Sequence, residues 1–336
     1  MAERSRDLAE RCNSNDLEQI HPRITAISSL WGKGGHLVLY LVKGARYALI
    51  DAGANDTPER AIVPALQQLG LDLTDVAAIL NTHDHADHVG GNAFVQRVSK
   101  AKVYFPKNEI PAMRGGYRGK ANFFRELREF FGAEGFESKV SEDLEWCGGG
   151  FRIHRRLDEG DVVDLGEGVE LKVVALPGHT PGSIGYLWDK EGILLAGDAV
   201  MARGPRPGGI PIISDSRSYE ASAARLMGMP IEMLCSYHRY LSFQLPAAAV
   251  RTGRDVNTFL EDSIYVIREL REAARRAVAA EPGAPLRVAG ERFIQELPAS
   301  FEVAPLDRAF PAIWPVWGLH SLIREAKAGI VPPGDA

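Results

Sequence analysis

Cysteine is scarce in this chain. Three cysteines occur in 336 residues, Cys12, Cys147 and Cys235, and they lie far apart. A disulfide framework needs paired cysteines, and a cysteine-rich zinc site needs closely spaced ones. The sequence therefore argues against both kinds of cross-link and fits a protein kept in a reducing compartment.

Long apolar runs and a surplus of basic residues are also missing. No stretch approaches the roughly 18 apolar residues that span a membrane. The N-terminal "MAERSRDLAERCNSNDLEQ" lacks the apolar core of a signal peptide. With 39 basic and 44 acidic residues the formal net charge is -5, which provides no basic face for nucleic acid. We expect a cytoplasmic protein that has neither a membrane nor a nucleic acid as its partner.

Two β-rich blocks with interleaved helices organise the sequence. The first contains "RITAISSL", "HLVLYLV" and "YALIDAG", and is followed by a predicted helix with Thr57 as N-cap, Pro58 at its first position and Gly70 at its end. The second block is "VELKVVALPGHTPGSIGYLWDKEGILLAGDAV". Such blocks predict an α/β fold of stacked sheets covered by helices. We expect an N-terminal segment over residues 1–22, a main domain over 23–250 with an insert at about 107–150, and a helical extension over 251–330.

Two amphipathic helices are predicted outside these blocks. Within the insert, "KANFFRELREFFG" places apolar side chains on one face, and "DVNTFLEDSIYVIRELREAARRAVAA" carries an apolar stripe at helical spacing. The simplest interpretation of the apolar face in the insert is that it packs in the protein interior. The alternative is that it forms a lid over a substrate cleft. The stripe fits core packing or a homodimer. The insert face consists of Phe123, Phe124, Leu127, Phe130 and Phe131, and the stripe of Val256, Phe259, Leu260, Ile264, Ile267 and Leu270.

The stretch "NTHDHADHVGGN" crowds three histidines and two aspartates directly behind the apolar strand "VAAIL". His83 and His85 alternate, so in an extended segment their side chains point the same way. Asp87 and His88 follow on a turn that two glycines allow to bend. One loop cannot complete the coordination shells of two metal ions, so further ligands are expected at the ends of other strands.

Three such ligands occur later in the chain, each after an apolar run. His179 lies in "VVALPGHTPGS", Asp198 in "ILLAGDAV" and His238 in "IEMLCSYHRY". Ligands on rigid strand ends converge with little entropy to lose. The other histidines are isolated, and we expect them to be ordinary surface or core residues; they are His21, His36, His154 and His320.

Together, these residues resemble the pattern of the metallo-β-lactamase superfamily, and within it the glyoxalase-II-like hydrolases, over residues 24–240. The resemblance implies a four-layer αββα sandwich, here with a C-terminal helical extension, and two metal ions at one edge of the sheets. It assigns one ion to His83, His85 and His179, the other to Asp87, His88 and His238, and a bridging role to Asp198.

The resemblance extends to the surroundings of the ligands. Asp51, in "LIDAG", matches an aspartate found beneath the family's metal site, so it is expected to support a ligand. The last ligand departs from the family's Pro-Gly-His-Gly turn, because it stands here in "SYHR". With that loop altered, Tyr237 and Tyr240 become candidates for the substrate pocket.

The implied chemistry is hydrolysis by a metal-bound hydroxide. Two bridged cations lower the pKa of their shared water toward neutrality. Asp87 and Asp198 are the expected catalytic residues, with Asp87 orienting the hydroxide or relaying its proton. Imidazole and carboxylate ligands suit two divalent ions, zinc first, with iron or manganese as alternatives. Because "HTPGS" resembles the thioester-cleaving branch, we expect a small-molecule ester, thioester or lactone as substrate.

Three other functions stay open on the sequence. A mononuclear iron enzyme that oxidises persulfides uses much the same scaffold, with two histidines and one aspartate as ligands. A phosphodiesterase of the same superfamily shares the histidine motif, although the acidic balance disfavours the nucleic-acid-processing branches. A regulatory protein would keep the metal site with little turnover. The complete second set of ligands favours the hydrolase.

Overall fold

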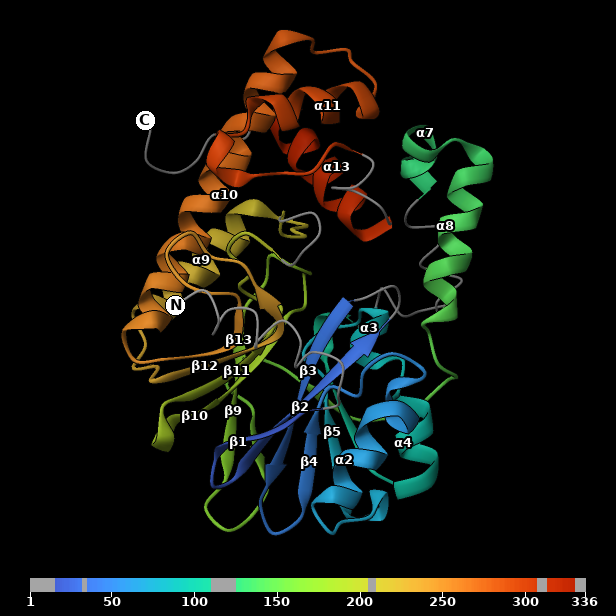
Figure 1. Cartoon of the computed structure of the whole chain (residues 1–336), viewed down its shortest axis with the longest axis vertical. Helices are drawn as coiled ribbons and strands as arrows, with labels where there is room; N and C mark the ends of the chain where they lie inside the picture. The colour runs from blue at the N-terminus through green and yellow to red at the C-terminus, as the bar shows by residue number, and fades with distance from the viewer. Residues whose placement is uncertain (1–15, 32–34, 110–124, 205–209, 307–312, 330–336) are drawn as a thin grey trace, which may run out of the picture.

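Two β-sheets packed face to face form the centre of the protein (Figure 1). A computed structural model describes residues 16–31, 35–109, 125–204, 210–306 and 313–329. The first sheet has seven strands in chain order: β1 (Leu17–His21), β2 (Ile24–Trp31), β3 (Gly35–Lys43), β4 (Tyr47–Ile50), β5 (Val76–Leu80), β6 (Lys102–Pro106) and β7 (Ile153–Leu157). The second has six, in the order β13 (Ala248–Thr252), β12 (Met233–Tyr240), β11 (Ile193–Gly197), β10 (Ile184–Trp188), β9 (Glu170–Ala175) and β8 (Val162–Asp164).

Strand β3 shows why both faces of the first sheet are buried. Successive side chains of a strand point to opposite faces. Val38, Tyr40 and Val42 pack against the second sheet, in a core that includes Leu171 and Tyr186. The alternate leucines of β3 belong to the outer core together with helix residues; they are Leu37, Leu39 and Leu41. The apolar run "HLVLYLV" is thus a strand covered on both sides.

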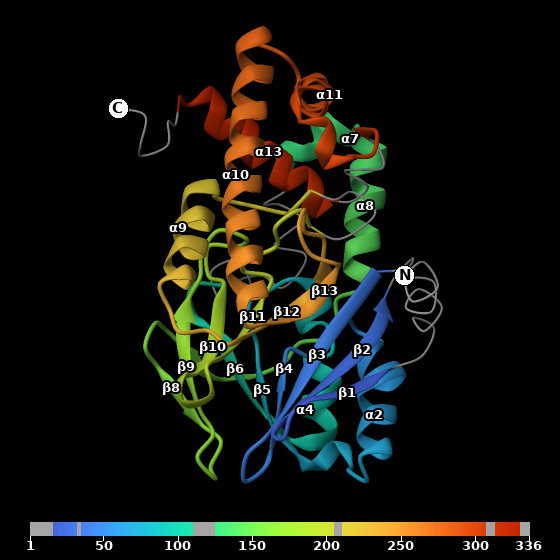
Figure 2. The same cartoon turned by 60° about the vertical axis from the view of Figure 1, so that its left-hand side comes forward.

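Helices cover the outer face of each sheet (Figure 2). The first sheet is covered by α2 (Val63–Gln68) and α4 (Asn92–Ser99), and the second by α9 (Ser216–Met227) and α10 (Arg254–Ala280). The layers therefore run helix, sheet, sheet, helix, and the predicted αββα sandwich is confirmed. Because β1 pairs with β2, the first sheet begins inside the predicted N-terminal segment; the division into domains stays a prediction.

The helix predicted after the first β-rich block is present, with a different start. Its first turn is a π-helix, η2 (Pro58–Ile62), which continues into α2. The Thr57 hydroxyl does not cap this helix, because it accepts a hydrogen bond from the backbone nitrogen of Ala54 (3.0 Å). Gly70 follows the helix with φ 71°, the left-handed conformation that ends many helices.

The C-terminal extension and the insert pack on each other (Figures 1 and 2). The extension consists of α10, α11 (Leu286–Glu296) and α13 (Ile313–Lys327), and the insert contributes α7 (Arg128–Phe131) and α8 (Ala133–Glu145). The stripe on α10 lies in this shared core, with Ile264 only partly buried, so the stripe packs within the chain. Whether the protein forms a homodimer stays a prediction.

The helix predicted over "KANFFRELREFFG" is present where the structure describes it, although its first turn is a 3-10 helix, and the helix α8 that follows was not predicted. A short 3-10 turn, η5 (Arg125–Leu127), leads into α7, and Gly132 with φ 72° separates α7 from α8. Leu127 and Phe130 are buried in the core shared with the extension, as the packing interpretation expects. Phe123 and Phe124 lie outside the described residues. No helix in the described part of the chain is long and apolar enough to cross a membrane.

The end of the insert is anchored beside the histidine loop. The backbone nitrogen of Asn55 donates to the carbonyl of Trp146 (3.1 Å), and its side-chain amide donates to the carbonyl of Glu145 (2.5 Å). Gly148 approaches the backbone of Gly90 so closely that a Cβ on Gly148 would lie 1.8 Å from the Gly90 oxygen. The glycines at both positions therefore permit a backbone contact between the insert and the histidine loop.

We expect Gly148→Ala to lower the free energy of unfolding by about 1–3 kcal/mol, because the new methyl group forces two backbone segments apart. Urea denaturation measures this change. Gly149→Ala is the matched control, since its Cβ would lie 3.7 Å from the Ala93 Cβ, an ordinary contact. Equal stability of the two variants would contradict the contact.

Candidate metal centre

All seven predicted ligands meet at one edge of the two sheets. His83 and His85 lie in the loop after β5, and Asp87 and His88 belong to the short helix α3 (Ala86–Val89). From the second sheet come His179, in the turn between β9 and β10, Asp198, directly after β11, and His238, on β12. The five histidines and Asp198 are buried, while the side chain of Asp87 is 13% exposed.

The position of His238 differs from the sequence expectation. The sequence places it after its strand, but β12 continues to Tyr240. The pairing of β12 with β13 is interrupted between Cys235 and Tyr240, and its pairing with β11 ends at Ser236. Because this part of β12 is not paired with its neighbours, it can contact β3 of the other sheet. There, His238 Nδ1 donates a hydrogen bond to the backbone carbonyl of His36 (2.6 Å).

Two buried tyrosines tie the sheets together next to the ligands. The Tyr40 hydroxyl on β3 donates to the carbonyl of Ser236 on β12, and the Tyr186 hydroxyl on β10 donates to the carbonyl of Asn81 (2.6 Å each). Asn81 and Ser236 each lie two residues before a histidine of the centre. These bonds set the position of one sheet's ligands relative to those of the other.

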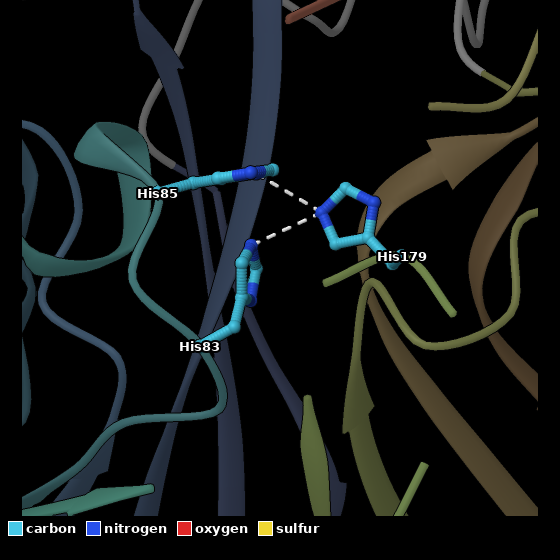
Figure 3. Close-up of side chains that lie close together, drawn as sticks. All are labelled: His83, His85 and His179. Atoms are coloured by element: carbon cyan, nitrogen blue, oxygen red, sulfur yellow. Dashed lines mark hydrogen bonds between the residues drawn. The ribbon is translucent and has the colours of Figure 1, made fainter. Parts of the chain in front are cut away.

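Three imidazole nitrogens form the first cluster (Figure 3). His179 Nε2 lies 3.2 Å from His83 Nε2 and 3.0 Å from His85 Nδ1. A tetrahedral zinc ion with Zn–N bonds of 2.0–2.1 Å separates neighbouring nitrogens by about 3.3 Å. The spacing therefore fits three ligands on one face of a tetrahedron.

A second cluster joins Asp87, His88, Asp198 and His238. His238 Nε2 lies 3.2 Å from Asp87 Oδ2 and 3.4 Å from Asp198 Oδ2. His88 Nε2 lies 3.2 Å from Asp198 Oδ2 and 3.9 Å from Asp87 Oδ2. Asp198 Oδ2 is also 3.8 Å from His179 Nε2 in the first cluster. Asp198 thus stands between the two clusters, where a bridging carboxylate would lie.

Hydrogen bonds behind the imidazoles point Nε2 of four histidines at the centre. His88 Nδ1 donates to Asp51, His179 Nδ1 to the carbonyl of Ile212, and His238 Nδ1 to that of His36, at 2.6–2.9 Å. Thr82 Oγ1 donates to Asp51, so it can accept from His83 Nδ1 (3.1 Å). A partner on the outer nitrogen selects the tautomer that leaves the inner nitrogen as a metal ligand. The imidazole nitrogens and carboxylate oxygens that face the centre are therefore the ligand atoms of a cation site.

Asp51 holds the histidine loop from beneath, as expected. It is fully buried, and it accepts hydrogen bonds from Thr82 N (2.9 Å), Thr82 Oγ1 (2.8 Å) and Asn81 Nδ2 (3.3 Å) in addition to His88. Its φ of 59° is left-handed, a conformation that aspartate and asparagine tolerate better than most residues. Asp51 therefore fixes both the start of the loop and the orientation of His88.

The charges of the centre shift one another's pKa values. Burial lowers the pKa of His83 and of His179. Burial also opposes a charge on His88 and His238, but Asp198 outweighs it: the pKa of His88 is raised to about 10 and that of His238 well above its ordinary value. Although burial works in the other direction, His238 and His88 hold the pKa of Asp198 well below its usual range.

The two candidate pocket tyrosines are buried behind the ligands. The Tyr237 ring packs on the His88 ring (centroids 3.8 Å apart), and its hydroxyl donates to the carbonyl of Asp87 (2.7 Å). The Tyr240 ring meets the His238 ring edge-on, and burial together with Asp198 raises the pKa of its phenol well above the ordinary value. These positions favour support of the ligands over contact with a substrate.

The other histidines lie away from the two clusters. His21 packs against Trp188, His154 Nδ1 accepts from the backbone nitrogen of Val103, and His320 packs against Trp317. His36 is the exception that the sequence did not reveal, because its backbone carbonyl orients His238. Ile212 was missed for the same reason. Every residue has a carbonyl, so no residue type marks such a role.

Comparison with known proteins identifies the family. The model of the metallo-β-lactamase superfamily matches residues 31–238. The chain belongs to the metallo-β-lactamase superfamily.

Relatives within the superfamily carry hydrolase names. A probable metallo-hydrolase of Bacillus subtilis is 30% identical over 172 residues, which are 50% of this chain and 54% of the relative. A hydroxyacylglutathione hydrolase of Rhodopseudomonas palustris is 31% identical over 150 residues, 44% of this chain and 43% of the relative. The chain thus spans about half the length of these curated relatives. A hydroxyacylglutathione hydrolase of Aeromonas hydrophila is 29% identical, with 68% of this chain and 70% of the relative covered.

Solved structures of the superfamily share the fold. A metallo-β-lactamase family protein of Thermus thermophilus matches with a TM-score of 0.70 at 21% identity, covering 94% of this chain and 97% of its own. A β-lactamase domain protein of Burkholderia ambifaria matches with a TM-score of 0.64 at 17% identity, covering 94% of this chain and 89% of its own. At these identities the likeness concerns the fold alone.

We expect Asp51→Asn to weaken zinc binding about 10–100-fold, because ligand-supporting partners contribute that much in metal sites. Asparagine keeps the left-handed backbone accessible but has one acceptor oxygen, which cannot serve both His88 and the two donors of Thr82. Competition with a chromophoric chelator measures the affinity. Asp56→Asn, later in the same connection between β4 and η2, is the control, since Asp56 pairs with Arg60 at the surface. Wild-type affinity in Asp51→Asn would refute the supporting role.

Zinc binding is expected to release protons at neutral pH. In the ion-free protein the pKa of His88 is about 10, so His88 is protonated at neutral pH and must lose its proton to bind a cation. The apparent affinity therefore rises as pH increases toward that pKa. Calorimetric titrations in two buffers of different ionisation enthalpy measure the number of protons released. Identical heats in both buffers would contradict protonation of the ion-free site.

Proposed function

We propose that this chain is a metal-dependent hydrolase with two divalent ions, zinc first, at the junction of its sheets. His83, His85 and His179 would hold one ion, Asp87, His88 and His238 the other, and Asp198 would bridge them. The observation that carries the proposal is the position of Asp198 Oδ2, 3.2 and 3.4 Å from two imidazoles of one cluster and 3.8 Å from an imidazole of the other.

The chemistry divides between the ions and the side chains around them. When bound, a pair of divalent cations lowers the pKa of coordinated water and polarises a carbonyl oxygen. Asp87, whose carboxylate is more exposed than that of Asp198, faces the solvent side and would orient the attacking water and accept its proton. The Tyr237 hydroxyl bond to the Asp87 carbonyl keeps this carboxylate in place.

A small ester, thioester or lactone is the proposed substrate class. Curated relatives over part of the chain are named hydroxyacylglutathione hydrolases, and the "HTPGS" sequence of the His179 turn resembles the thioester-cleaving branch. The mononuclear iron oxygenase needs two histidines and one aspartate. It would leave three further imidazoles and a carboxylate of the centre without a metal to bind, and buried charges without partners are costly. The second cluster therefore favours the hydrolase.

Metal content and a substrate panel test the proposal. We expect about two zinc ions per chain and hydrolysis of thioester, ester or lactone probes in preference to phosphodiesters. His85→Ala removes a nitrogen of the first cluster and should lose one ion and nearly all turnover. His154→Ala is the control, because His154 is exposed on β7, away from the centre.

Three results would overturn the proposal. One iron per chain with oxygen consumption on persulfides would indicate the oxygenase. Two bound ions with turnover of phosphodiesters alone would indicate the phosphodiesterase. A wild-type chain that binds zinc but hydrolyses none of the probes would favour the regulatory protein.

A further inference from the structure

A buried glutamate outside the metal centre contacts the turn that carries His179. Glu109 ends the 3-10 turn η4 (Lys107–Glu109), which follows β6 and opens the insert. Its side chain is buried, with the residue 2% exposed. Its Oε1 atom accepts hydrogen bonds from the Thr180 hydroxyl and from the backbone nitrogen of Gly182 (2.8 Å). A residue of the first sheet's connection thus binds a loop of the second sheet.

Other bonds also hold this part of the chain: the Gly178 carbonyl accepts from the backbone nitrogens of Ser214 (2.8 Å) and Asp215 (3.1 Å). The backbone nitrogen of Ile184, at the start of β10, donates to the Thr82 carbonyl of the histidine loop (3.0 Å), so Glu109 is one of several anchors of the turn.

Within the turn, Gly178 N donates to the Thr180 carbonyl (3.0 Å) and Thr180 N to Ser183 Oγ (3.2 Å). The Thr180 and Ser183 hydroxyls also bond to each other (2.7 Å). These bonds shape the turn, but they do not attach it to the opposite sheet. Gly182 lies so close to Glu109 that a Cβ there would come within 2.7 Å of Glu109 N and Oε1.

His179 differs from its two neighbours in how it reaches the first cluster. His83 and His85 share one loop, which Asp51 fixes from below through Thr82. His179 comes from the other sheet, and its imidazole is held by the Ile212 carbonyl. The first cluster therefore closes only if the His179 turn has the right position relative to the first sheet. Glu109 accepts a hydrogen bond from Thr180, the residue directly after His179, so it acts where the His179 turn meets the first sheet.

We propose that Glu109 is a positioning residue, which fixes the His179 turn against the first sheet and so sets the affinity of one of the two metal ions. Through the same contact, the start of the insert at η4 is linked to the metal centre. This inference rests on the proposed function only in that His179 binds an ion. Its measure is metal affinity and does not depend on which substrate is hydrolysed.

Substitutions at this contact can distinguish whether Glu109 acts through its hydrogen bonds or through its negative charge. Glutamine keeps a side-chain oxygen that accepts from both Thr180 and Gly182. Alanine removes the acceptor, so the Thr180 hydroxyl and the Gly182 backbone nitrogen both lose their bond to Glu109. Leaving a buried donor without its acceptor costs more free energy than a hydrogen bond usually contributes. On the turn, Thr180→Ser keeps the donating hydroxyl, whereas Thr180→Val removes it at nearly constant shape. Each side of the contact thus offers a conservative and a disruptive variant.

Zinc titration against a chromophoric chelator tests the inference, with thermal unfolding of the ion-free proteins measured in parallel. We expect Glu109→Ala and Thr180→Val to weaken one of the two zinc equivalents about 10-fold or more, as loss of a ligand-supporting partner does. The other equivalent stays at wild-type affinity, and Glu109→Gln and Thr180→Ser bind both equivalents like the wild type. Glu137→Ala, on the exposed face of α8 where Glu137 pairs with Arg128, is the matched control in the insert.

Several outcomes would overturn the inference. Wild-type affinity for both equivalents in Glu109→Ala and Thr180→Val would remove the positioning role. Equal weakening of both equivalents, together with a lower unfolding temperature, would indicate a purely structural glutamate. Glu109→Gln behaving like Glu109→Ala would indicate that charge matters and the hydrogen bonds do not. If Glu109→Ala fails to fold, the Thr180 pair decides. A wild-type chain that binds no zinc would instead overturn the proposed function, and this inference with it.

Discussion

The buried carboxylates of Asp51 and Asp198 and the largely buried carboxylate of Asp87 need positive charge beside them, and the rest of the site follows from that constraint. A buried carboxylate without a partner is strongly unfavourable, and its pairing has to be geometrically good to offset the loss of water. Here five imidazoles surround the carboxylates, and two of these imidazoles have raised pKa values for this reason. A divalent cation supplies the same balance with better geometry, because imidazole nitrogens and carboxylate oxygens already converge on it.

The αββα sandwich meets this constraint by dividing the ligands between two sheets. The first sheet contributes one compact loop, anchored by Asp51. The second contributes a turn, the end of β11 and a position within β12, so neither sheet holds a complete set. The apolar core between the sheets is therefore a condition for metal binding as well as for stability. Tyr40 and Tyr186 make the link specific, because their hydroxyl bonds cross from sheet to sheet close to the ligands.

Elements outside the sandwich also converge on the His179 side. The segment before α9 supplies the Ile212 carbonyl, and Ser216 at the start of α9 is bound by Glu325 of the C-terminal helix α13. Gly318 of α13 packs close to the backbone nitrogen of Ile213. From the other side, the insert reaches the same turn through Glu109 and packs α8 against α13 and α7 against α11. The insert and the C-terminal extension thus touch the groups that support the ligands directly.

The sequence by itself determined the features that depend on residues close together in the chain, namely single strands and the ligand-bearing loop. The apolar run "HLVLYLV", rich in aliphatic residues, predicts a strand, and the spacing of His83, Asp87 and His88 predicts a ligand-bearing loop. The distant ligands His179, Asp198 and His238 are predicted because each follows an apolar run and the family resemblance links them to the loop; the structure places them together.

The tertiary structure alone decided which groups stand behind the ligands. The extension of β12 through His238, the burial of Tyr237, and the carbonyls of His36 and Ile212 follow from the packing of one sheet on the other. Glu109 belongs with them, since an isolated glutamate in a sequence has no sign of its partner. A hydrogen bond between segments far apart in the chain depends on their positions in space, and those positions are set only when the apolar faces pack.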